Sequence, residues 1–162
     1  MRPVKLVTDA NVWIDLDNGG LTTVVFSLPH AFASPDTVVR ELGPELGAEL
    51  GALGLEVLET PPERQHEWVT LRARYRLPSD AGLHALPHAR LLGTRLVTGD
   101  RDLRNATDAE GVQVSGQLWI MDELVDRALL SRRAAGHSLR QIRDDGVRLP
   151  ADEVRKRLRA WR

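Results

Sequence analysis

The sequence contains no cysteine, and that absence alone removes several kinds of site. Disulfide bonds, zinc–thiolate centres and cysteine nucleophiles are excluded together. Lysine is nearly absent as well, since only Lys5 and Lys156 occur among 22 cationic residues. No apolar run approaches the roughly 20 residues of a membrane span, and no run of signal-peptide length precedes the first carboxylate. We therefore expect a soluble protein of the cytoplasm.

The length and the charge distribution describe one globular domain with an uneven surface. A chain of 162 residues with 42% hydrophobic residues is sufficient for one core. Residues 1–126 hold 11 Lys and Arg against 19 Asp and Glu, whereas residues 127–162 hold 11 against 4. This basic tail suggests a polyanionic partner, although arginines that simply solvate helices give the same composition.

Short apolar runs alternate with segments of helical periodicity along most of the chain. This alternation predicts a three-layer α/β/α sandwich around a parallel sheet of about five strands. Residues 79–92 are expected to form a helix with a kink or interruption near Pro87, because proline lacks an N–H donor. The runs expected to be strands are residues 4–8, 30–34, 55–60, 94–98 and 111–115.

Acidic residues stand where the expected strands end. Asp9 follows the first strand and Asp100 follows the fourth. These two strands are neighbours in a 3-2-1-4-5 sheet, so their terminal carboxylates are expected to converge at its carboxyl edge. Glu41 lies on a helix after the second strand, and Asp80 opens a later helix. Carboxylates gathered at one edge repel one another. Binding of a hard divalent cation usually relieves such repulsion.

These residues resemble the acidic quartet of PIN-domain ribonucleases, the family of many VapC-type toxins. The resemblance rests on Asp9 with Asn11 after a short strand, on Glu41 and Asp80, and on Asp100 in LVTGDRDLR. Residues 91–120 are similar to the last two strands of that family and the turns around them. The resemblance covers most of residues 4–130 and implies the PIN-like strand order 3-2-1-4-5. We expect residues 1–130 to form the PIN-like domain. Residues 131–162 are then a basic helical extension packed on it.

The resemblance implies metal-dependent cleavage of RNA phosphodiester bonds, in the manner of a toxin of a type II toxin–antitoxin pair. Asp9, Glu41, Asp80 and Asp100 would be the catalytic residues that hold Mg²⁺ or Mn²⁺, with Asp102 as a further candidate ligand. The residues that would orient these carboxylates or water by hydrogen bonds are Asn11 and Thr98. The partners implied are an RNA substrate, a cognate antitoxin and a second copy of the chain in a homodimer.

Each acidic residue also has a plain structural interpretation. Asp9 suits a helix N-cap, Asp80 competes with Ser79 for that role, and Glu41 suits a solvated helix face. Asp102 suits the first turn of a helix, where the helix dipole favours a negative charge. Both interpretations can hold for the same side chain.

Other kinds of site and function fit the sequence less well than a nuclease. His84 and His88 have the spacing of two helical metal ligands, but Pro87 lies between them and the first histidine has no adjacent glutamate. The four tryptophans are expected in the core or an interface rather than as base-stacking platforms. A haloacid-dehalogenase-type phosphohydrolase needs a second aspartate where this chain has Asn11. A non-catalytic PIN-like interaction module also remains open.

Overall fold

A five-stranded parallel sheet forms the centre of the computed structural model, which describes residues 4–146 and 149–162. Its strand order is β3-β2-β1-β4-β5, so the expected order and the three-layer α/β/α class are confirmed. The strands are β1 (Val4–Thr8), β2 (His30–Pro35), β3 (Glu56–Leu58), β4 (Leu96–Val97) and β5 (Val114–Ser115).

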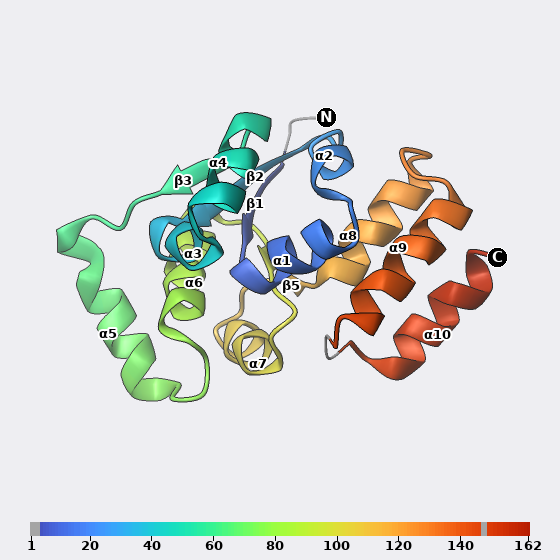
Figure 1. Cartoon of the computed structure of the whole chain (residues 1–162). Helices are drawn as coiled ribbons and strands as arrows, with labels where there is room; N and C mark the ends of the chain where they lie inside the picture. Colours follow the sequence, from blue (N-terminus) through green and yellow to red (C-terminus); the bar gives the residue numbers. More distant parts are fainter. Residues whose placement is uncertain (1–3, 147–148) are drawn as a thin grey trace.

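Helices cover both faces of the sheet and extend beyond it at one end (Figure 1). None of the described helices is both long and apolar enough to cross a bilayer. The helices are α1 (Ala10–Asn18), α2 (Thr22–Val25), α3 (Asp36–Leu42), α4 (Pro44–Leu53), the 3₁₀ helix Pro62–Arg64, α5 (Gln65–Arg74), α6 (Asp80–Leu92), α7 (Arg101–Ala109), α8 (Gln117–Asp126), α9 (Arg132–Asp144) and α10 (Ala151–Ala160).

The alternation of side chains along the central strands creates two cores, one on each face. Leu6 of β1 and Val97 of β4 belong to the first core, while their neighbours Val7 and Leu96 belong to the second. Successive residues of a strand point to opposite faces, so a run of consecutive apolar residues fits a sheet covered on both sides.

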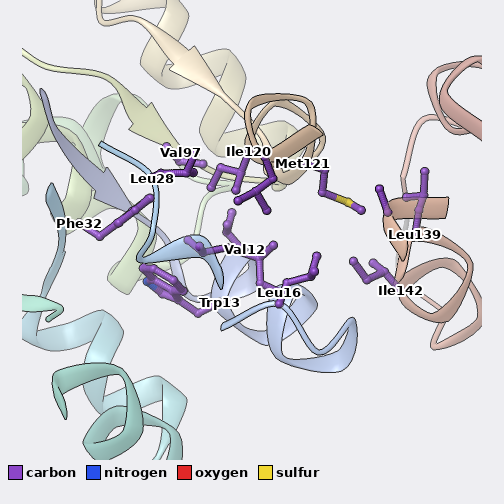
Figure 2. Close-up of a cluster of buried hydrophobic side chains, with 14 of the residues drawn as sticks. Val12, Trp13, Leu16, Leu28, Phe32, Val97, Ile120, Met121, Leu139 and Ile142 are labelled. Carbon is purple, nitrogen blue, oxygen red and sulfur yellow. The ribbon is translucent and has the colours of Figure 1, made fainter. Parts of the chain in front are cut away.

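The first core extends from the sheet through α1 to the C-terminal helices. Figure 2 shows Phe32 and Val97 near Val12 and Trp13 of α1, with Met121 of α8 and Ile142 of α9 continuing the cluster outward. Trp13 is completely buried, and its Nε1–H donates to the Ser34 hydroxyl at 3.0 Å. This buried hydrogen bond fixes α1, which Asp9 caps, against β2.

The second core lies under α6, where the sequence predicted a kink or interruption near Pro87. Pro87 does lie inside α6, but the helix is not interrupted and runs from Asp80 to Leu92. Proline removes one main-chain hydrogen bond. The fully buried residues around it supply packing energy that offsets this loss. They are Leu83, Ala85, Leu86 and Ala89.

The basic segment after residue 130 folds against the first core. Ser131 caps α9 by accepting a hydrogen bond from Ala134 N at 3.1 Å, and Leu139 and Ile142 of this helix are fully buried. The Ser138 hydroxyl donates to Gly19 O at 2.8 Å, which joins α9 to the end of α1. α9 and α10 lie side by side at one end of the molecule (Figure 1). The arginines of these two helices are exposed except Arg157, which is half-buried, and the inner faces of the helices are apolar.

We expect Ile142→Ala to lower the free energy of unfolding by about 2 to 4 kcal/mol, because it removes a buried side chain that joins α9 to α1. Urea denaturation followed by circular dichroism measures the change. Arg140→Ala, an exposed substitution on the same helix, should change stability by less than about 0.5 kcal/mol. An equally small effect of Ile142→Ala would mean that α9 does not share the core of the domain.

Candidate active site

Asp9 is the most constrained acidic residue at the carboxyl edge of the sheet. It follows β1 directly, caps α1 and is only 4% exposed. Its Oδ1 accepts a hydrogen bond from Ala10 N at 2.8 Å. Its Oδ2 accepts from the Asn11 amide at 3.0 Å and from the Thr98 hydroxyl at 2.9 Å. Both carboxylate oxygens are therefore held in fixed positions.

The end of β4 meets Asp9 through the same hydrogen bonds. Thr98 Oγ1, which donates to Asp9, accepts from Asp100 N at 3.1 Å, and Asn11 Oδ1 accepts from Gly99 N at 2.8 Å. Asp100 caps α7, since its Oδ2 accepts from Leu103 N at 3.1 Å. Asp9 and Asp100 are thus brought to one site across 91 positions of sequence because β1 and β4 are adjacent strands.

Burial and like charges act in the same direction on Asp9. Burial raises its pKa above the ordinary value, and repulsion from Glu41 and Asp100 adds to this effect. The hydrogen bonds from Ala10 N and Thr98 oppose it by stabilising the carboxylate. The influence of Glu41 and Asp100 on the pKa of Asp9 indicates that three carboxylates share one electrostatic environment.

Glu41 reaches this environment from α3, which packs against α1. Its neighbour Val38 is fully buried and Val39 is half-buried, so α3 is anchored by these apolar side chains. Glu41 itself is exposed. Its carboxylate is therefore available for a ligand at the edge of the site.

Asp80 lies near the same edge but is engaged elsewhere. Ser79, not Asp80, caps α6, and its hydroxyl accepts from Gly82 N at 3.0 Å. The Asp80 side chain is 70% exposed and forms an ion pair with Arg72 at 2.8 Å. The first turn of α6 approaches Asp9 closely, since a Cβ at Gly82 would lie 3.7 Å from Asp9 Oδ2. The backbone of α6 is therefore close to the site, while the Asp80 carboxylate is bound to an arginine.

Other candidate ligands are more dispersed. Asp102 is half-buried in the first turn of α7. His84 Nδ1 lies 2.7 Å from Asp80 O, and His88 Nε2 lies 3.0 Å from the Thr60 hydroxyl. Within residues 4–146 and 149–162, no group of three or more His, Cys, Asp or Glu side chains is arranged to hold a metal ion. The carboxylates of Asp9, Glu41 and Asp100 nevertheless offer oxygen ligands, which Mg²⁺ and Mn²⁺ prefer.

Sequence reasoning missed a buried pair behind the site, Asp15 and Gln117. Asp15 is 4% exposed, and the Gln117 amide, itself 3% exposed, donates to its Oδ2. Gln117 also lies against the turn before Asp100, because a Cβ at Gly99 would be only 2.6 Å from its Oε1. Asp15 stands four residues after Asn11 on α1, so the spacing of two polar residues on one helix face was the available signal.

A hollow of about 1000 Å³ opens beside Asp100. Residues of α7, of the turn before α8 and of α10 form its walls. The candidate site is therefore not closed off on this side, and there is room next to Asp100 for part of a large substrate.

A family model described as a PIN domain, DUF3368, matches residues 5–162. The chain belongs to the PIN-domain family. Its fold is also similar to the crystal structure of PAE2754 from Pyrobaculum aerophilum, with a TM-score of 0.55 and 18% sequence identity. That similarity covers 74% of this chain and 89% of the other. No curated protein matches the sequence significantly. PIN domains are generally metal-dependent nucleases and typically use divalent metals.

We expect the stability of this PIN domain to depend on pH because of Asp15. Burial raises the pKa of Asp15 to about 6, which the hydrogen bond from Gln117 only partly opposes. The folded state therefore keeps this proton to a higher pH than the unfolded state, and stability falls as pH rises from about 4 to about 6. We expect Asp15→Asn to increase the free energy of unfolding by about 1 to 3 kcal/mol at pH 8 and to change it little at pH 4.

Urea denaturation at both pH values measures this difference. Asp17→Asn is the matched control, because Asp17 is an exposed aspartate on the same helix. It should leave stability nearly constant at both pH values. An Asp15→Asn protein that is less stable than the parent at pH 8 would show that the ionised carboxylate is required for folding.

Proposed function

We propose that this PIN domain is a metal-dependent endoribonuclease that hydrolyses phosphodiester bonds of RNA in the cytoplasm. The observation that carries the proposal is the buried Asp9 carboxylate, oriented by Asn11 and Thr98 beside Asp100. A buried carboxylate whose pKa is raised by burial and by neighbouring carboxylates is costly to maintain as an anion. A bound divalent cation offsets the free-energy cost of the ionised carboxylate. The arrangement is therefore the one expected of a metal site.

Asp9, Glu41 and Asp100 are the residues that would hold Mg²⁺ or Mn²⁺, directly or through water. Asp80 would join them after release from Arg72, and Asp102 would contribute from α7. When bound, a divalent ion lowers the pKa of water and neutralises charge on the phosphate. Glu41 is exposed and Asp100 is half-buried, so the substrate phosphate has access from the open side.

The chain's own residues would orient the reacting groups. Asn11 and Thr98 donate hydrogen bonds to Asp9 Oδ2 and thereby keep the carboxylate group from rotating. The Asp100 main chain is held by Thr98, and its side chain is held by the first turn of α7. This preorganisation matters because carboxylates already in position need little reorganisation during the reaction. No protein nucleophile is required.

One observation favours a second candidate, a PIN-like module that binds without cleaving. Asp80, one of the four expected metal ligands, forms an ion pair with Arg72 instead. If this ion pair persists when a metal is present, the site has three carboxylates at most. The family match gives no support to the haloacid-dehalogenase alternative.

We further propose that the cleavage serves as the toxin of a type II toxin–antitoxin pair, acting as a homodimer that a cognate antitoxin restrains. The support for this role is the acidic motif pattern in the sequence. A short neighbouring reading frame that encodes a protein with a DNA-binding amino terminus would support it. Co-purification of the two products as a complex would test the role directly.

We expect Asp9→Asn to abolish metal-dependent RNA cleavage and Glu41→Gln to reduce it by about 100-fold or more, because each removes a charged ligand from a preorganised site. Single-turnover cleavage of a labelled RNA in Mg²⁺ or Mn²⁺ measures both effects. Glu41→Gln keeps the shape and helix propensity of the residue, so its stability should remain within about 0.5 kcal/mol of the parent.

Glu45→Gln, an exposed substitution on the next helix, is the matched control and should cleave at the parental rate. Parental cleavage by Glu41→Gln together with an inactive Asp9→Asn would reduce the site to three acidic residues. RNA that remains intact with the parent protein in either metal would favour the non-catalytic module.

Metal binding should also be measurable as stability. At a concentration of Mg²⁺ or Mn²⁺ about 100 times its dissociation constant, the cation should add about 2.7 kcal/mol and raise the melting temperature by about 5 to 10 °C. The double variant Asp9→Asn/Asp100→Asn should lose most of this increment in differential scanning fluorimetry.

The charge-matched control is Asp108→Asn/Asp126→Asn, which changes two exposed aspartates of α7 and α8. This control should retain the full metal-dependent shift. An identical shift in the parent and in Asp9→Asn/Asp100→Asn would show that the metal binds somewhere else.

A further inference from the structure

We infer that the hollow beside Asp100 is a groove for a single strand of nucleic acid, in which Arg101 and Arg104 contact phosphates next to the cleaved one. This inference rests on the proposed function and names how that substrate is held. It concerns binding outside the carboxylate cluster.

The position of the hollow provides the first argument. Its volume of about 1000 Å³ is at the upper limit of ordinary small-molecule pockets and exceeds what one small metabolite fills. Its lining includes Asp100 and Asp102, Gly116 and Gln117, and residues of α10. A strand whose phosphate lies at Asp100 therefore continues directly into this space.

The second argument is the distribution of charge along the hollow. Arg101 and Arg104 are both exposed and stand three residues apart in the first turns of α7. Neither has a carboxylate within 4 Å in the described part of the chain. Arg157, by contrast, is paired with Asp122 and Glu153. These two guanidinium groups lie next to Asp100 and Asp102. This is the pattern expected where a metal ion and a polyanion bind side by side.

Gly116 explains how Arg104 reaches the hollow. A Cβ at Gly116 would lie 3.3 Å from Arg104 Nη1 and 3.3 Å from Thr98 O. The missing side chain therefore leaves space for the guanidinium group above the turn between β5 and α8. Arg104 is held over the floor of the hollow rather than directed away from it.

The far wall of the hollow comes from the C-terminal segment. Leu149, Pro150 and Glu153 line it, and α10 is fixed to α8 because Arg157 Nε and Nη2 donate to the Asp122 carboxylate at 2.8 and 2.6 Å. The hollow is thus bounded by α7 on one side and by the C-terminal segment on the other, and we infer that it holds one strand rather than a duplex. Grooves that follow single strands characteristically combine such confinement with positive charge.

The test measures binding of a fluorescent single-stranded RNA of about ten nucleotides in EDTA, where metal-dependent cleavage does not occur. We expect Arg101→Ala/Arg104→Ala to weaken binding about tenfold or more at 0.1 M salt. The slope of log affinity against log salt should become shallower by about 1.4, since each phosphate contact with a single strand contributes about 0.7. Arg104→Lys alone should keep the slope within about 0.3 of the parental value, because it retains the charge.

Arg132→Ala/Arg133→Ala is the matched control, because both are exposed arginines of α9 with no ion pair among the described residues. It should change affinity by less than about threefold. Equal losses in the two double variants would mean that only net charge matters, and that result would overturn the inference. A blunt RNA duplex of equal length should compete at least about tenfold less well, and equal competition would overturn the single-strand assignment.

The binding assay also separates this inference from the proposed function. A parent protein that binds the single strand through Arg101 and Arg104 but cleaves no RNA in Mg²⁺ or Mn²⁺ would refute only the ribonuclease. A parent protein that cleaves RNA, with Arg101→Ala/Arg104→Ala binding and cleaving equally well, would refute only the groove. Circular dichroism of each variant confirms that it is folded.

Discussion

The hydrogen bonds that join Asp9 to Thr98 and Asn11 are the interaction on which the candidate site depends. They connect the end of β1 to the end of β4, and they place a buried carboxylate at the junction. The same groups also cap α1 and position Asp100 at the start of α7. The same hydrogen bonds therefore cap the helices and orient the acidic residues. A role as a helix cap and a role as a metal ligand are compatible for these side chains.

Electrostatic repulsion sets the next constraint. The charges of Glu41 and Asp100 raise the pKa of Asp9, whereas Asp80 forms an ion pair with Arg72. An arginine that neutralises one carboxylate lowers the charge of the cluster and also competes with any cation for that carboxylate. Arg72 is itself fixed by the Pro78 and Tyr75 carbonyls at 2.8 Å each, so releasing Asp80 does not require Arg72 to leave its place. The ion pair with Asp80 is partly exposed, which makes it a weak competitor.

The C-terminal helices connect the core to the open side of the site. The apolar faces of α9 and α10 continue the first core, and the Arg157–Asp122 pair sets the position of α10. The basic composition of this segment therefore has two components. Some arginines hold the helices together through carboxylates, as Arg157 does, and others are exposed. Counting charges in the sequence did not distinguish these two groups, because the distinction depends on which carboxylates lie within reach.

The sequence alone determined the order of the sheet, the placement of Asp9 and Asp100 at its carboxyl edge, and the family. Alternating apolar runs with 2.0 and 3.6 periodicity report local burial and thereby the fold class, whereas the strand order was implied by the resemblance to PIN domains. The continuity of α6 through Pro87, the pairing of Asp80 with Arg72, and the contact of Asp15 with Gln117 were decided by tertiary structure. These contacts join residues from different elements, 102 positions apart in the case of Asp15 and Gln117. The hollow beside Asp100 likewise has walls from α7 and α10, which come together only when the helices pack. Local periodicity carries no information about such distances, and packing does.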